Sequence, residues 1–206
     1  GWASNTRAGF NNVDADYFAG VLAAYDSVVG GRRYSSSRRI RSGSLLHELD
    51  VQDLSSLRNS PLAEMIGVRS AGKFVPSFVW RTSPAFKATF VAALFEGDGS
   101  SSLLGPGIIQ ISYSTLSARL ATEVQQLLLE FGVISKLCHY ESGEIKVVIT
   151  NRREARRFMA RIGFFGRKQA KLERQLSSVP LTGRAMSRDH VPFVSAYVRA
   201  NGATRW

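Results

Sequence analysis

Two short segments of this sequence resemble each other, and their likeness limits the folds open to the chain. The first runs from Asp14 to Ser27, is rich in Ala, and has an Asp at its start that can cap a helix. The second covers residues 83–100, where a Ser-Pro pair begins a helix that ends at Asp98. The copies lie 72 or 73 residues apart, which predicts an internally duplicated chain.

The second half has the clearer order of elements. The sequence predicts a strand from Gly107 to Tyr113 and an amphipathic helix from Leu116 to Phe131. A hairpin of residues 133–140 and 145–150 should follow, and then a basic helix over residues 151–162. This order of helix, two strands, helix, two strands and helix predicts a symmetrical repeat of αββαββα type.

The first half is expected to follow the same order less clearly. A hairpin is predicted for residues 28–34 and 38–42, with helical stretches over residues 45–67. The fold class is therefore expected to be α/β (α+β), with two pseudosymmetric αββαββα halves that form a saddle with β-ribbons. The halves should be residues 1–82 and 83–176, with residues 177–206 as a C-terminal extension.

Composition and charge point to a folded protein with a polyanionic partner. Of the 206 residues, 44% are apolar and 21% charged, which excludes a mainly disordered chain. Lys and Arg outnumber Asp and Glu by 27 to 16, giving a net charge of +11, and most of the cations are Arg, whose planar fork suits phosphate. Apolar runs are too short to span a membrane, and no secretion signal is seen, so an intracellular place in the cytoplasm or nucleoid is expected. The single Cys138 excludes an internal disulfide.

A nine-residue segment carries a family resemblance. The run Val-Ala-Ala-Leu-Phe-Glu-Gly-Asp-Gly, from Val91 to Gly99, resembles the signature of the LAGLIDADG homing endonucleases, and residues 73–80 resemble the approach to it in intein-borne members. The small side chains of Ala92 and Ala93 allow two helices to pack closely. The resemblance implies two crossed helices, each delivering one carboxylate to divalent metals, with Mg²⁺ as the expected cofactor. It assigns Asp98 as a catalytic and metal-binding acid, although an Asp in a Gly-Asp-Gly turn also has a purely local role.

The partner acid in the first copy has two alternatives. Alignment on the acids pairs Asp26 with Asp98 as the second catalytic and metal-binding residue, but sets Val21 where the close crossing requires a small residue. Alignment on the small residues sets Tyr25 at the acid position instead. A phenol that titrates near pH 10 cannot replace a metal-binding carboxylate, so the second alternative implies the loss of one active site.

Two lysines are candidate catalytic cations. The segment Gly-Arg-Lys-Gln-Ala-Lys around Lys168 resembles the family segment that places a lysine beside the scissile phosphate, and Lys73 occupies the corresponding place before the first-half boundary. A fixed cation there stabilises negative charge developing on phosphate. Either lysine could instead be an ordinary surface charge. Glu96 is expected to be solvated or paired with an Arg.

The candidate DNA-binding residues lie on the predicted hairpins, because a two-stranded ribbon fits the major groove. Alternation sets neighbouring side chains on opposite faces, so only part of the set can face DNA. The candidates in the first half are five arginines, and those in the second half are four residues of the equivalent strands: Arg32, Arg33, Arg38, Arg39 and Arg41, and Gln110, Ser112, Lys136 and Lys146.

The resemblance, which covers roughly residues 12 to 176, implies a monomeric, site-specific endonuclease that cuts a long double-stranded DNA target. Because the sequence starts Gly-Trp and ends Arg-Trp, a nuclease region excised from an intein splicing domain is expected, with residues 177–206 resembling the return segment. The alternative is a degenerate DNA- or RNA-binding protein of the same fold, a maturase or a regulator. The target sequence, the host and the role of residues 177–206 are open.

Overall fold

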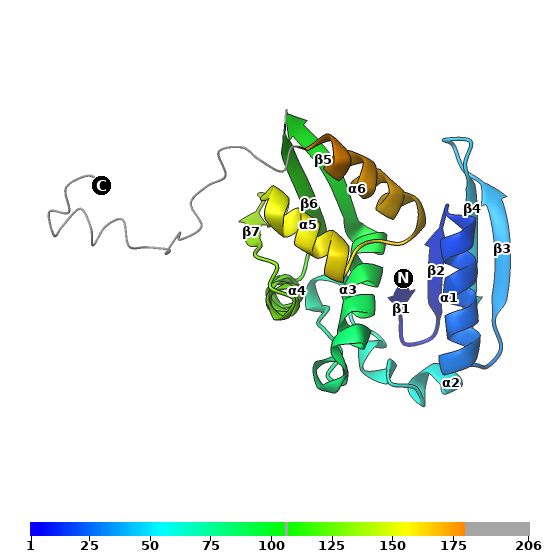
Figure 1. The fold of residues 1–206 in the computed structure, drawn as a ribbon. Helices are drawn as coiled ribbons and strands as arrows, with labels where there is room; N and C mark the ends of the chain where they lie inside the picture. Colours follow the sequence, from blue (N-terminus) through cyan, green and yellow to red (C-terminus); the bar gives the residue numbers. More distant parts are fainter. Residues whose placement is uncertain (106, 180–206) are drawn as a thin grey trace, which may run out of the picture.

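The protein contains two four-stranded antiparallel sheets with the same strand order (Figure 1). The structure is a computed structural model and describes residues 1–105 and 107–179. The first sheet has the order β1-β2-β4-β3, with strands β1 (Trp2–Ala3), β2 (Ala8–Asn12), β3 (Tyr34–Arg39) and β4 (Leu45–Val51). The second has the order β5-β6-β8-β7, with strands β5 (Gly99–Gly105), β6 (Ile108–Thr115), β7 (Lys136–His139) and β8 (Ile145–Ile149). The expected mixed fold with two sheets is confirmed.

Six α-helices of the described chain accompany the sheets: α1 (Ala15–Val28), α2 (Ser55–Arg58), α3 (Pro84–Asp98), α4 (Ala118–Glu130), α5 (Arg152–Arg161) and α6 (Gly166–Ser178). Four of these helices, α1, α3, α4 and α5, begin with a side-chain cap. In each, the cap residue accepts a hydrogen bond from a backbone N–H group that has no partner within the helix. The caps are Asp14, Ser83, Ser117 and Asn151. Short 3₁₀ turns at residues 63–65, 70–72 and 79–81 connect α2 to α3.

The hairpin of the first half lies further along the chain than predicted. Residues 34–39 pair with 45–51, so the prediction of strands at 28–34 and 38–42 and of helix from residue 45 is wrong. The turn falls at residues 40–44, where Gly43 adopts a φ of +84° that other residues rarely take. In β4, alternate residues bury against α1, with Leu49 and Val51 inside, and this period of two overrides the helix prediction.

The helix at residues 15–28 is not the counterpart of α3, contrary to the predicted repeat. In the first half two strands precede α1, and two follow it, just as β5–β6 precede and β7–β8 follow α4. The caps Asp14 and Ser117 therefore correspond, and the repeat spacing is about 103 residues rather than 72. The sequence analysis did not predict the strands β1 and β2, because both strands are short and residues 2–12 include several polar side chains. Two Ala-rich helices look alike in sequence even when they occupy different places in a repeat.

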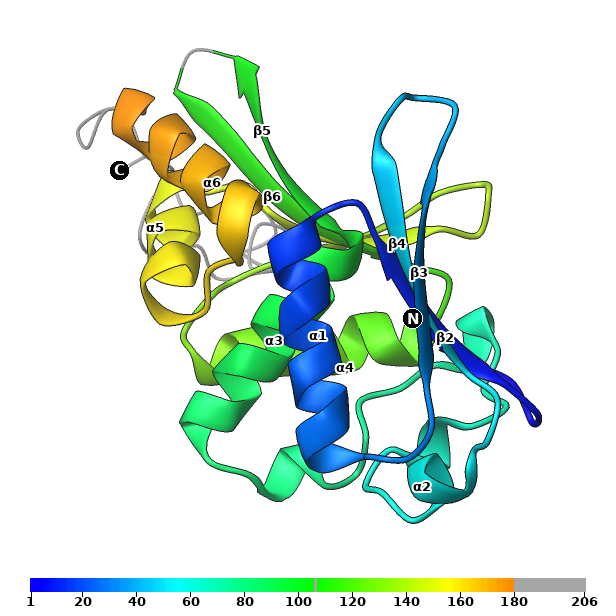
Figure 2. The ribbon, with the colours of Figure 1, turned by 90° about the vertical axis from the view of Figure 1, so that its right-hand side faces the viewer.

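The apolar core is concentrated in the second half. One cluster of 23 buried residues includes Val91 and Phe95 of α3, whereas the cluster of the first half has six buried residues. Val75 and Val79, from the segment before α3, pack in the larger cluster. In both views the β3–β4 and β5–β6 hairpins extend toward the same end of the molecule (Figures 1 and 2). In the described parts of the chain, no helix has the length and apolar character needed to cross a bilayer.

Candidate active site

Asp98 is the last residue of α3, and the chain turns from it directly into β5. A Cβ atom on Gly99 would lie 2.4 Å from the carbonyl oxygen of Phe95, so only glycine allows the turn. Phe95 is fully buried and contacts three rings, those of Tyr113, Phe158 and Phe164, at centroid distances of 5.5, 4.8 and 6.1 Å. The helix end is thereby anchored, while Asp98 remains exposed.

The carboxylate of Asp98 is available for a ligand. Among residues 1–105 and 107–179, none donates a hydrogen bond to it or forms an ion pair with it. It lines a cavity of about 450 Å³ together with Lys73, Tyr113 and Glu144. Burial, and then the charge of Asp98, raise the pKa of the Tyr113 phenol. Asp98, which the sequence predicts as a catalytic acid, thus lines a cavity and has no side-chain partner in the described parts of the chain.

Lys168, which the sequence predicts beside the scissile phosphate, lies at the same end of α3, and its ammonium contacts the backbone. The Nζ atom donates hydrogen bonds to the carbonyl oxygens of Glu96, of Gly97 at 3.5 Å and of Gly99 at 2.8 Å. Carbonyls at a helix C-terminus lack partners within the helix and carry partial negative charge, which a cation neutralises. Burial lowers the pKa of Lys168, while Glu96 and Asp98 oppose this effect. Lys168 therefore holds the end of α3 in place.

Glu96 is buried, so the prediction that it is solvated or paired with Arg is wrong. Its side chain accepts a 2.9 Å hydrogen bond from the N–H of Phe165, just before α6. Burial raises the pKa of Glu96, while the Phe165 bond and Lys168 lower it in turn. Glu96 and Lys168 together tie the end of α3 to the start of α6. No local signal in the sequence indicates this contact, because the two elements are separated by about 70 residues.

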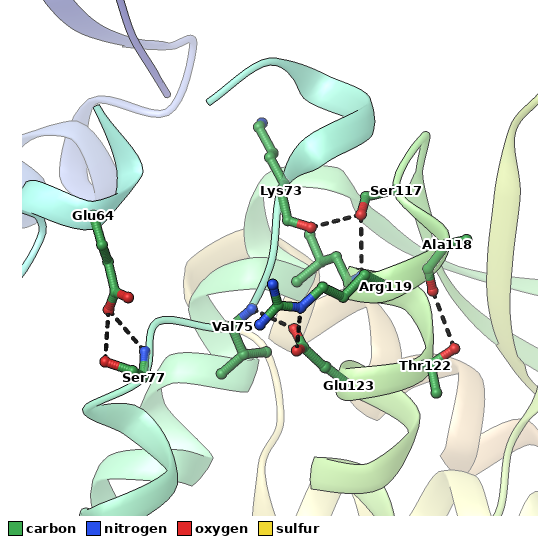
Figure 3. Close-up of polar contacts among 10 residues, drawn as sticks. Glu64, Lys73, Val75, Ser77, Ser117, Ala118, Arg119, Thr122 and Glu123 are labelled. Atoms are coloured by element: carbon green, nitrogen blue, oxygen red, sulfur yellow. Dashed lines mark hydrogen bonds and ion pairs between the residues drawn. The ribbon is translucent and has the colours of Figure 1, made fainter. Parts of the chain in front are cut away.

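Lys73 is fixed through its backbone, and this feature also escaped prediction. Figure 3 shows that the Ser117 hydroxyl donates to the carbonyl oxygen of Lys73, at 2.5 Å, while the Lys73 ammonium points away from α4. Two residues further on, the N–H of Val75 donates to the carboxylate of Glu123 at 2.6 Å. Hydrogen bonds from Ser117 and to Glu123 thus hold the backbone of residues 73–75 against α4. Lys73 also lines the cavity that Asp98 lines.

Asp26 and Asp98 are not brought together by the structure. Asp26 lies in the last turn of α1 and accepts two hydrogen bonds from Arg33, at 2.7 and 2.6 Å. The Arg33 bond lowers the pKa of the exposed Asp26 carboxyl. Helix α1 runs antiparallel to α3 in both views, so its first turn, not its last, approaches the end of α3 (Figures 1 and 2). The charges of Glu96 and Asp98 raise the pKa of Tyr17 in that region, after the larger effect of burial. The paired-acid prediction fails because α1 is the wrong helix.

Tyr25, the other alternative, does not lie at the acid position either. It lies one residue before Asp26 at the same distant end of α1, and its buried hydroxyl has no hydrogen-bond partner among residues 1–105 and 107–179. Burial, followed by the charge of Asp26, raises the pKa of the phenol.

The candidate arginines of the first half lie on or beside β3, a strand whose six residues are all exposed. Arg38 and Arg39 point to opposite faces, as expected from their alternation, and Arg38 pairs with Glu48 at 2.7 Å. Arg39 donates to the carbonyl oxygen of Gly43 in the turn that also contains Arg41. Arg32 lies over the ring of Tyr34 at 5.2 Å, and Arg33 is committed to Asp26.

The four candidates of the second half share the helix-free face of their sheet. Along β6 and β8, the side chains of Ile111, Val147 and Ile149 face the core. The candidate residues alternate with these core residues or pair with residues that do, so they face the other side of the sheet. The register sets Ser112 beside Val148, which in turn pairs with Lys136. Ser112 is buried and contacts Ser100 at 3.3 Å, so it is the least accessible of the set: Gln110, Ser112, Lys136 and Lys146. Lys146 pairs with Glu144 at 3.5 Å.

Comparison with known proteins defines the class. Residues 85–163, which contain most of α3, the second sheet, α4 and α5, match the family model of the LAGLIDADG-like domain. The homing endonuclease I-WcaI bound to its DNA recognition sequence has a similar fold, with a TM-score of 0.57, 11% identity and coverage of 81% of this chain and 74% of that one. Full-length DUF199/WhiA from Thermatoga maritima has a TM-score of 0.53 at 13% identity, covering 96% of this chain and 60% of that one. Residues 85–163 of this chain therefore match a LAGLIDADG-like domain, and the fold of the chain is similar to that of a homing endonuclease.

Its curated relatives are longer proteins. The chain is 52% identical over 206 residues to the A subunit of DNA gyrase from Mycolicibacterium flavescens and from Mycobacterium malmoense. The matches cover all of this chain, but only 37% and 43% of those two proteins. Replicative DNA helicase DnaB of Synechocystis sp. is 30% identical over 141 residues, which are 63% of this chain and 16% of that protein. The chain thus spans less than half the length of the relatives it matches.

Proposed function

We propose that this chain is the endonuclease region of an intein carried by a gyrase A polypeptide, and that it hydrolyses phosphodiester bonds in a long DNA site. One observation carries the activity: Asp98, the exposed acid at the end of α3, lines one cavity with Lys73, and the buried Phe95 anchors this helix end. The similarity to parts of gyrase and helicase polypeptides supports an inserted element, since one chain type matches two unrelated hosts.

A divalent metal fits Asp98, although this residue supplies only part of a site. Its unpaired carboxylate oxygens are hard ligands of the type that Mg²⁺ prefers. In residues 1–105 and 107–179, no group of three or more His, Cys, Asp or Glu side chains could enclose a metal ion. Asp98 would hold Mg²⁺, which supplies Lewis-acid stabilisation of phosphate oxygens. Lys73 would supply a fixed positive charge beside the phosphate, and Lys168 would keep Asp98 in position through the backbone of α3.

The DNA would lie along the two ribbons. Exposed cations of β3 and the β3–β4 turn would contact one part of the duplex, and Lys136 with Gln110 another. The net charge of +11 favours duplex DNA over smaller anionic substrates. A monomer would suffice, because both ribbons belong to one chain.

The experiment is cleavage of a plasmid that carries the uninterrupted gyrase A gene, with Mg²⁺, by the whole intein and by the 206-residue chain. Cutting of both strands at one position supports the proposal with two working acids, and nicking of one strand supports it with one. A plasmid without the gene controls for non-specific cleavage. Cleavage of neither strand, at protein concentrations that retard the same DNA in a gel, overturns the nuclease function.

That last result would identify the second candidate function, a non-cleaving DNA-binding protein of the same fold. The observation that favours it is that Asp26, the predicted partner acid, pairs with Arg33 at the far end of α1 and does not meet Asp98. Such a protein would prefer its DNA site over unrelated DNA at 0.15 M salt, whereas a general basic scaffold would lose its affinity without a specific remainder.

A further inference from the structure

The first half of the chain has an apolar groove on its surface. Its volume is about 1160 Å³, and it is lined by β1, β2, one side of α1, and residues 62–73. Trp2, Tyr25 and Val28 contribute to its walls, and the side chain of Val28 is 62% exposed. A groove of this size and apolar character is a candidate docking site.

Strand register relates the groove to the second half residue by residue. The β2–β4 ladder begins with Ala8 opposite Val51, as the β6–β8 ladder begins with Ile111 opposite Ile149. Trp2 then pairs with Gly9 as Ser100 pairs with Ser112. The position of Gly1 is therefore equivalent to that of Gly99, the residue that follows α3.

The equivalent positions differ sharply in burial. On α4, Val124 and Leu127 are fully buried, and Phe131, at the end of α4, is 8% exposed. On α1, the equivalent Ala24 is exposed, Val21 is half-buried and Val28 is 62% exposed. Tyr25, equivalent to the buried Leu128, has a buried hydroxyl to which no described residue is hydrogen-bonded. One helix therefore has a covered face where the other has an open one.

Helix α3 is what covers these positions in the second half. It contacts β5, β6 and α4, and its Phe95 packs on Tyr113. The groove is lined by the three equivalent elements, β1, β2 and α1, and Phe10, the equivalent of Tyr113, lies in its wall. The first half thus has the seat for an α3-like helix and no helix of residues 1–105 or 107–179 in it.

We propose that the groove is the seat of an apolar helix that precedes Gly1 in the longer polypeptide and runs directly into β1, as α3 runs into β5. The chain spans 37% and 43% of two gyrase relatives, so sequence for such a helix exists outside it. The last residue of that helix would lie on the side of Asp98, since Gly1 lines the groove together with Lys73, and Lys73 also lines the cavity of Asp98.

The test is a fusion that joins a copy of residues 83–98 directly to Gly1 of the whole 206-residue chain. The copied helix should fill the groove, raise the Tm by at least about 4 °C and reduce the fluorescence of a dye that binds exposed apolar surface. The matched control carries V91D and F95D in the copied helix alone and should show neither effect. Neither readout requires DNA cleavage, so failure here and failure of the nuclease activity are distinguishable.

A substitution in the groove gives a second check. Val28→Lys should change the Tm of the unfused chain little, because the side chain is exposed, but should remove most of the gain in the fusion. An equal Tm for the fusion and the unfused chain, or an equal gain for the control helix, overturns the proposal. A rise in dye binding when residues 180–206 alone are removed also overturns it, because that result identifies the C-terminal segment as the occupant. A gain in Tm that depends on protein concentration overturns it as well, because that result identifies a second copy of the chain as the occupant.

Discussion

Lys168 donates a 2.8 Å hydrogen bond to the carbonyl oxygen of Gly99, the residue that immediately follows the exposed acid Asp98. The same ammonium group reaches the carbonyls of Glu96 and Gly97, so it closes the C-terminal end of α3. A lysine assigned by sequence to phosphate contact thus has its donors directed at the backbone. Its effect on chemistry would pass through the position of Asp98.

Replacement of Lys168 should therefore reduce stability as well as cleavage. Lys168→Met leaves carbonyl groups of the helix end without their partner, which costs about 1–3 kcal/mol. Chemical denaturation of the variant and of the parent chain measures this loss. Lys171→Met, on the same helix, is the control and should stay within about 0.5 kcal/mol of the parent. Unchanged stability together with lost cleavage would instead indicate direct contact with the phosphate.

Asp98→Asn should abolish cleavage while DNA binding survives. The amide removes the negative charge that a metal requires, and loss of a focused electrostatic contribution to the transition state slows reactions by at least about 100-fold. Strand cleavage and gel retardation, measured on the same DNA, separate the two effects. Asp26→Asn provides the comparison, and we expect near-parental cleavage because Asp26 pairs with Arg33 at the other end of α1. Equal losses in both variants would restore the paired-acid interpretation.

Glu96 should make the stability of the protein depend on pH. Its pKa is raised in the folded state by burial, so folding favours the protonated form. Stability from this group is then greatest below the unfolded pKa, and is lost as the pH rises from that value through the folded pKa. The free energy of unfolding of the parent minus that of Glu96→Gln should fall over this window, because the amide does not titrate. A flat difference would mean that the pKa of Glu96 is the same in the folded and unfolded states.

Salt dependence can identify the DNA-binding face. Lys136 is exposed on the helix-free face of the second sheet, and Lys136→Gln should lower the slope of log affinity against log salt by about 0.9 if it contacts one phosphate. Arg153 is exposed on α5. Arg153→Gln should leave the slope nearly unchanged, and the opposite pattern would place DNA on the helices.

Phe95 should be among the most sensitive positions of the core. It is fully buried among three aromatic rings and anchors the helix that carries Asp98. Phe95→Ala should destabilise the chain by about 3–5 kcal/mol, through lost transfer energy and the cavity left behind. Phe86→Ala, on the exposed side of the same helix, is the control and should cost much less. Thermal unfolding followed by circular dichroism measures both.

Local signals in the amino-acid sequence were enough to place several elements. The Ser83 cap, the turn residue Gly99 and the apolar stripe of α4 specify where helices begin, end and face, because each acts through neighbours within a few residues. They were sufficient to locate α3, the acid Asp98 at its end and the LAGLIDADG-like domain that residues 85–163 match. Three further facts emerge from the folded chain alone: α1 corresponds to α4, Glu96 is buried against Phe165, and Lys168 bonds the backbone. These facts depend on contacts between residues far apart in the chain, and two similar apolar helices are distinguished by what packs against them, which composition does not record.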